Sequence, residues 1–156
     1  MRSVDTYLNF AGKTEEAFEF YRSVFGGEYE SRYTYADFGG VQAGHAETDL
    51  GRIAHISLRL SPTFILMGSD VPSKSAADLT LGSNTYINLN VESEEEGRRL
   101  FQALSAGGRV EHPLEKTSLA EQYCSLRDRF CVQWMFNYLL EQYTRYDFFF
   151  NVSGTS

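Results

Sequence analysis

Hydrophobic and polar positions near the N-terminus follow first a two-residue and then a helical period. Residues 4–10 alternate between apolar and polar side chains, a pattern typical of a half-buried strand. Thr14 is then a candidate N-cap ahead of Glu15-Glu16, where the helix dipole favours negative charge. Apolar residues recur at helical spacing up to Gly26-Gly27, a pair suited to ending a helix. This pattern predicts a strand followed by a helix.

The same pattern returns in the second half of the chain. Thr85-Tyr86-Ile87-Asn88-Leu89 repeats the residue types of Thr6-Tyr7-Leu8-Asn9-Phe10. Ser93 then takes the N-cap position, with Glu96 at capping-box spacing, and Gly107-Gly108 ends the second predicted helix. The chain therefore contains an internal duplication of a strand and a helix.

Three strand-like stretches follow each predicted helix. They cover residues 28–35, 53–60 and 63–68 in the first half, and 109–112, 123–127 and 132–138 in the second. The fold class is therefore α+β, with two tandem β-α-β-β-β modules. Because one module alone leaves a sheet face uncovered, we expect the two modules to associate.

The expected domain organisation is one domain over residues 1–138. It consists of modules 1–70 and 84–138, joined by a linker, 71–83, that is rich in turn-forming residues. An aromatic tail, 139–156, follows. Its run of aromatic residues is typical of a subunit or subdomain contact.

The composition limits the classes of function. The chain has 156 residues and a formal net charge of −7, which argues against nucleic-acid binding, because such binding depends on clustered Lys and Arg. No apolar run is long enough for a membrane span, and the N-terminus carries no signal-peptide pattern. Cys124 and Cys131 are too few for a disulfide framework. We therefore expect a cytoplasmic protein.

The order of these segments resembles the vicinal-oxygen-chelate superfamily, which includes glyoxalase I, bleomycin-resistance proteins and extradiol dioxygenases, and most closely its PhnB-like branch. The segments that carry the resemblance are Tyr7-Leu8-Asn9-Phe10, Glu15–Tyr21, Val24–Gly27, Ala54–Leu58, Leu66–Asp70, Arg127–Phe130 and Gln133–Met135. Two departures stand out: Cys131 replaces a glycine, and Leu119-Ala120 replaces a Trp-Gly pair.

The resemblance implies that each sheet curls into half of an open barrel, with the helices outside, the ligand inside, and a homodimer as the assembly. Superfamily members that hold a metal use His or Glu on the first and last strands of each module. The matching positions here are Tyr7 (or Thr6), Met67, Tyr86 and Met135. Phenol and thioether are poor ligands for a divalent cation, so we expect no metal and no cofactor. Relatives are often labelled demethylubiquinone methyltransferases, but no glycine-rich turn follows a parallel strand here.

The candidate binding residues form a neutral lining of the barrel. They are Tyr7, Asn9, His55, Met67, Tyr86, Asn88, Gln133, Met135 and Asn137. The amides suit a polar, uncharged small ligand, and cross-strand amide bonds within the sheet are an equally good explanation. His55 is either a weak acid/base candidate or a structural histidine. Asp70 is expected to cap the turn after its strand, with ligand orientation as the alternative.

Two functional hypotheses follow. The first is metal-independent binding of a small polar organic ligand in the cavity between the sheets. The alternative is an isomerase or lyase that uses His55 or a tyrosine as acid/base, or that recruits a metal. A purely structural partner protein is a third hypothesis, which would require the space between the sheets to be filled by side chains.

Overall fold

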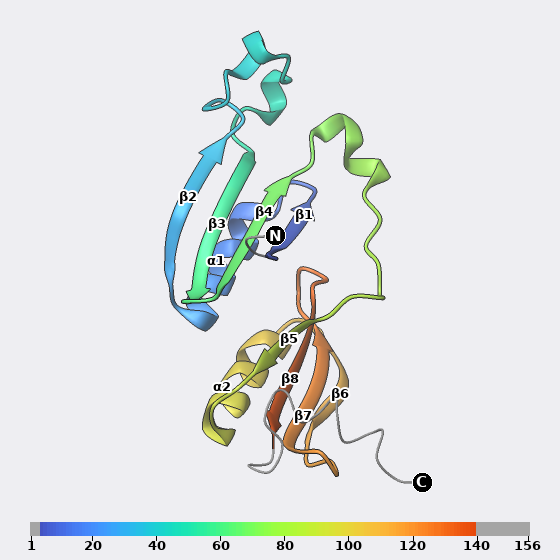
Figure 1. The fold of residues 1–156 in the computed structure, drawn as a ribbon. Helices are drawn as coiled ribbons and strands as arrows, with labels where there is room; N and C mark the ends of the chain where they lie inside the picture. The colour runs from blue at the N-terminus through green and yellow to red at the C-terminus, as the bar shows by residue number, and fades with distance from the viewer. Residues whose placement is uncertain (1–3, 140–156) are drawn as a thin grey trace, which may run out of the picture. The chain divides into compact units, whose positions relative to one another are not determined.

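The computed structural model describes residues 4–139, and the chain divides into two compact units, Met1–Leu81 and Gly82–Ser156. Within the described residues, unit 1 contains one α-helix, four strands and three short 3-10 helices, and unit 2 repeats the order of the α-helix and the strands (Figure 1). The elements are β1 (Thr6–Phe10), α1 (Thr14–Phe25), β2 (Glu28–Thr34), β3 (Ile53–Ser61), β4 (Phe64–Asp70), β5 (Ile87–Asn90), α2 (Glu94–Ser105), β6 (Arg109–Glu115), β7 (Ala120–Arg127) and β8 (Gln133–Leu139). The predicted α+β fold of two β-α-β-β-β modules is thereby confirmed. The aromatic tail, apart from Leu139, lies outside the described residues.

The strand order is the same in both sheets. Unit 1 has the order β1-β4-β3-β2 and unit 2 the order β5-β8-β7-β6, and the first strand of each unit pairs in parallel with the last. The remaining neighbours pair antiparallel. Neither sheet closes on itself. The expected domain boundaries, with a linker over 71–83, remain a prediction; residues 73–78 of that segment form a short 3-10 helix.

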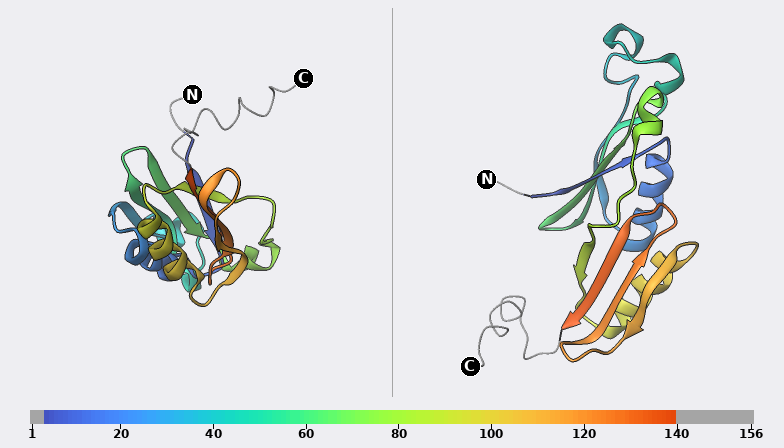
Figure 2. Two further views of the ribbon diagram at one scale, coloured as in Figure 1. Left: turned by 90° about the horizontal axis from the view of Figure 1, so that it is seen from below. Right: turned by 90° about the vertical axis from the view of Figure 1, so that its right-hand side faces the viewer.

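Each sheet carries its helix on one face (Figure 2). In unit 1 the buried core joins Phe18 and Tyr21 of α1 to Ile56, Leu58 and Leu66. In unit 2 the buried side chains include Leu100, Leu104, Leu126, Trp134 and Phe136. The alternation of strand residues therefore puts apolar side chains under the helix, and the assignment of Trp134 to the core is confirmed.

The two helices begin in different ways. Ser93 caps α2 as predicted, since its hydroxyl accepts the Glu96 N–H at 3.1 Å. Thr14, in contrast, is not an N-cap: it lies in the first turn of α1, and its hydroxyl donates to Asp70 Oδ1 at 2.7 Å. Gly26 ends α1 with φ of 76°, a conformation that glycine adopts without a steric cost.

Asp70 does not cap the turn that follows it. Its buried carboxylate accepts the backbone N–H groups of Gly12 and Thr14 at 2.8 and 3.1 Å, and that of Ile53 at 3.1 Å. The prediction that Asp70 caps the turn after its strand is therefore wrong. Asp70 connects the start of α1 with the start of β3, and these hydrogen bonds account for burying a charged group.

Candidate functional site

In unit 2 the sheet face opposite α2 carries polar and half-buried residues. Asn88, Met135 and Tyr123 lie on this face, because Trp134, Phe136 and other alternate positions turn toward the helix. Cross-strand pairing places Asn88 next to Met135, and Tyr123 next to Asn137. One sheet face thus gathers residues from three strands.

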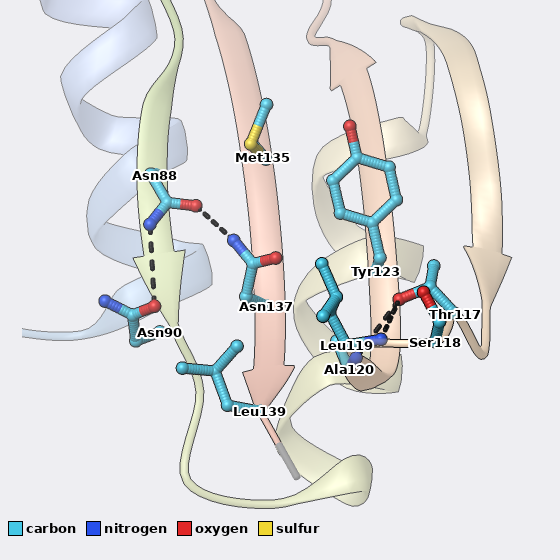
Figure 3. A pocket seen from close by; sticks show the side chains of 10 residues that line it. All are labelled: Asn88, Asn90, Thr117, Ser118, Leu119, Ala120, Tyr123, Met135, Asn137 and Leu139. Carbon is cyan, nitrogen blue, oxygen red and sulfur yellow. Dashed lines mark hydrogen bonds between the residues drawn. The ribbon is translucent and has the colours of Figure 1, made fainter. Parts of the chain in front are cut away.

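A pocket of about 640 Å³ lies over this face, within the range of roughly 300–1,000 Å³ that is typical of small-molecule sites. Figure 3 shows side chains from β5, β8 and β7 and from the loop before β7 surrounding it. The lining residues are Asn88, Asn90, Thr117, Ser118, Leu119, Ala120, Tyr123, Met135, Asn137 and Leu139. None of these ten side chains carries a charge at neutral pH.

Three amides form a row along one wall of the pocket (Figure 3). Asn137 Nδ2 donates to Asn88 Oδ1 at 2.5 Å, and Asn88 Nδ2 donates to Asn90 Oδ1 at 3.5 Å. Asn88 and Asn137 therefore bond to each other across the strands, and both also line the pocket. Their contact with a ligand stays a prediction.

The opposite wall is a short loop fixed by one hydroxyl group. Thr117 Oγ1 accepts the backbone N–H groups of Leu119 at 3.3 Å and Ala120 at 3.1 Å, and the Thr117 N–H donates to the Ala120 carbonyl at 2.9 Å. This turn presents Leu119, which is 41% exposed, beside the pocket. These hydrogen bonds fix the backbone of the loop that forms this wall.

Several charged and phenolic side chains of unit 2 outside the pocket lining are paired with other side chains. Lys116 and Glu121 flank the loop and form an ion pair at 2.6 Å. The Tyr86 hydroxyl donates to Glu111, and this hydrogen bond raises the pKa of Tyr86 above its usual value. Arg127 donates to Gln133 Oε1 at 2.8 Å.

Two predicted binding residues of unit 2 lie on the same face but do not line the pocket. Gln133 is buried, and its side-chain N–H group donates to the Thr85 carbonyl at 2.5 Å, so its amide has structural partners. Tyr86 is engaged with Glu111.

The open face of unit 1 brings together the other predicted residues. Tyr7 pairs with Met67 in the strand register, and the Tyr7 hydroxyl lies 3.3 Å from His55 Nδ1. Asn9 Oδ1 accepts a hydrogen bond from the Ser69 hydroxyl at 3.3 Å. The placement of all nine residues around one shared cavity stays a prediction.

Sequence reasoning missed most of the residues that line the pocket. Alternation along the strands could have found Asn90 with Asn88, and Leu139 with Asn137. The loop residues Thr117–Ala120 follow no periodic pattern, so their approach to the sheet is visible only in three dimensions.

The donors at the superfamily's metal positions do not fit a divalent cation. Tyr7 and Met67 offer a phenol and a thioether, and Met135 of unit 2 adjoins the amide of Asn88; such cations prefer imidazole, carboxylate or thiolate ligands. Within residues 4–139, no three His, Cys, Asp or Glu side chains gather in a way that could hold a metal ion.

Known proteins are similar over most of the chain. The crystal structure of protein PA1353 from Pseudomonas aeruginosa is 33% identical, with a TM-score of 0.77 and coverage of 89% of this chain and 98% of that one. Protein YjdN of Escherichia coli (strain K12) is 28% identical over 146 residues, which cover 89% of this chain and 97% of YjdN. No protein-family model matches the chain.

A third relative carries a functional label of its own. A putative 3-demethylubiquinone-9 3-methyltransferase, PhnB protein, from Bacillus cereus is 26% identical, with a TM-score of 0.72 and coverage of 88% of this chain and 99% of that one. A glyoxylase/bleomycin resistance protein/dioxygenase domain from Frankia sp. EAN1pec, 12% identical with a TM-score of 0.58 and coverage of 92% and 96%, shares the fold.

The fold and the comparisons with known proteins show that this chain has the glyoxalase fold. The sheet of its second unit carries a pocket whose lining side chains are uncharged. The chain belongs to the PhnB-like branch of the vicinal-oxygen-chelate superfamily. No helix within residues 4–139 has the length and apolar content of a membrane span.

Proposed function

We propose that this protein binds a small organic molecule in the unit 2 pocket without the help of a metal ion. The observation that carries the proposal is the lining of this pocket, which offers amides, hydroxyls, a thioether and aliphatic groups but no charged side chain. Such a lining selects a ligand by shape and hydrogen bonding. That the protein forms a homodimer and that it is cytoplasmic are two further predictions, which do not depend on this proposal.

The test uses chelator-treated protein and Nile red, an uncharged fluorescent dye. Dye fluorescence should rise saturably, with a dissociation constant that is the same with and without EDTA. Leu119→Asp places a charge in the pocket wall and should weaken binding by about tenfold or more, because the carboxylate loses hydration when the dye covers it.

Val110→Asp is the matched control. Val110 lies in the same unit and is also 41% exposed, but it does not line the pocket, so this variant should bind the dye like the unmodified protein. Equal loss in both variants, or binding that returns only on adding zinc or manganese, would contradict the proposal.

A second candidate function is acid/base catalysis, favoured by the contact between Tyr7 and His55 on unit 1. The phenol and the imidazole together could pass a proton to or from a ligand. Hydrogen–deuterium exchange at carbon in candidate carbonyl compounds would test it. A His55→Gln variant that exchanges as fast as the unmodified protein would exclude His55.

A further inference from the structure

We infer that the ligand of the unit 2 pocket is an uncharged amphipathic molecule bound in one orientation. Its hydrogen-bonding group lies against the amide row of Asn90, Asn88 and Asn137, and its apolar part lies against Leu119 and Leu139. The inference rests on the proposed function and adds the chemical class of the ligand.

The amide row determines which polar group fits. The two hydrogen bonds run in one direction, from Asn137 to Asn88 and from Asn88 to Asn90. Each amide carries two N–H donors and a carbonyl acceptor, so the row retains N–H groups at Asn90 and a carbonyl oxygen at Asn137 that these two bonds do not use. A group that both donates and accepts, such as a carboxamide or lactam, complements such a row.

The apolar side chains of the pocket lie at two places in Figure 3: Leu119 lies across from Asn88 and Asn90, in the loop before β7, and Leu139 and Met135 lie on β8 below and above Asn137. Leu119 is one of the large hydrophobic side chains that this unit exposes, and Leu139 and Met135 are only partly buried. Covering these side chains with an apolar skeleton removes their surface from water, which favours binding. A ligand that is polar throughout would not obtain this favourable contribution to the binding free energy.

The electrostatic surroundings disfavour a charged ligand. The cation nearest to the loop in sequence, Lys116, is paired with Glu121 at 2.6 Å. The whole chain has a net charge of −7, so an anion would meet net repulsion, and the cation beside the loop is already paired with a carboxylate. A cation would lack a carboxylate among the lining residues.

Three probes with one skeleton test this inference: 2-naphthamide, 2-naphthoate and naphthalene. Naphthoate has nearly the shape of the amide but carries a negative charge, and naphthalene lacks the polar group. We expect the amide to bind about tenfold more tightly than either of the others, measured by naphthalene fluorescence on the full chain.

Variants separate the two walls. Asn88→Leu has similar volume and should reduce the preference for the amide over naphthalene to about twofold or less. Leu119→Asn should weaken the amide and naphthalene alike, because it removes the apolar contact that both share. Asn84→Leu, an exposed amide outside the pocket, should change nothing.

The outcomes distinguish this inference from the proposed function. Equal binding of all three probes, or an amide preference that survives Asn88→Leu, overturns the inference while the pocket still binds small molecules. Failure of Nile red and of every naphthalene probe to bind overturns both. Circular dichroism of Asn88→Leu checks the fold, and Asn90→Leu repeats the test should Asn88→Leu be unfolded.

Discussion

Cys131 lies in the turn between β7 and β8 with φ of 66°, and it is the one non-glycine residue of the described part of the chain with a positive φ. The turn is held by Asp128, whose carboxylate accepts the backbone N–H groups of Phe130 and Val132 at 2.8 and 3.0 Å and the Trp134 indole N–H at 2.9 Å. Between these two N–H groups the chain adopts the left-handed conformation at Cys131, which brings a β-carbon close to the backbone.

Replacing Cys131 with glycine should stabilise the protein. Removing the β-carbon removes the steric cost of a positive φ in the folded protein. This cost is larger than the entropic cost of ordering glycine, which has more freedom in the unfolded chain, so we expect the free energy of unfolding to rise by about 0.5–1 kcal/mol. Urea denaturation measures this change. Cys131→Ala keeps the β-carbon and should show no gain; a Gly variant less stable than the Ala variant would contradict the account.

The sequence indicated a special role for Asp70 but not the correct one. Its position after a strand suggested a cap for the next turn, which is a local contact. Its partners are instead Gly12, Thr14 and Ile53, which come near it only when β4 pairs with β1 and β3. Such contacts between residues far apart in the chain carry no periodic signal.

At the scale of elements, alternation identified the faces of the strands well. It assigned Asn88 and Met135 to one face of the sheet and Trp134 and Phe136 to the other. In the structure Trp134 and Phe136 are buried under α2, and Asn88 and Met135 lie on the opposite face. The wall formed by Thr117–Ala120 could not be found this way, because a loop has no period. Its shape depends on the Thr117 hydroxyl and two backbone N–H groups.

Thr117 should therefore act as a positioning residue for the pocket. Thr117→Val keeps the volume but removes the hydroxyl, so Leu119 should lose its fixed place, and affinity for 2-naphthamide should fall by about three- to tenfold. Because the loop is largely exposed, the free energy of unfolding should change by only about 1 kcal/mol or less.

Thr117→Ser restores the hydroxyl and should recover most of the affinity. Fluorescence titration measures binding and urea denaturation measures stability in both variants. If the Ser and Val variants bound 2-naphthamide equally poorly, the side-chain hydrogen bonds of Thr117 would not be what shapes the wall.

At the scale of the whole molecule, the duplicated order of elements was predictable because every signal for it is local. Strand alternation, the Ser93 cap and the glycine pairs each act within a few residues. The shared cavity is a different kind of prediction, since it depends on contacts between residues of both units. The pocket found within unit 2 arises from strand pairing and one loop alone.

The net charge of −7 should also change the affinity of the pocket for charged ligands, because no side chain that lines the pocket carries a charge that would outweigh the field of the whole chain. The repulsion of 2-naphthoate is then a sum over carboxylates outside the pocket lining, which salt screens strongly: the Debye length falls from about 30 Å at 0.01 M to about 3 Å at 1 M. We expect the affinity ratio of 2-naphthamide to 2-naphthoate to fall by about threefold or more between these concentrations. Taking the ratio cancels the general effect of salt on apolar binding, and fluorescence titration at several salt concentrations measures it. A ratio that rose with salt would reveal a cation beside the ligand and would contradict the uncharged site.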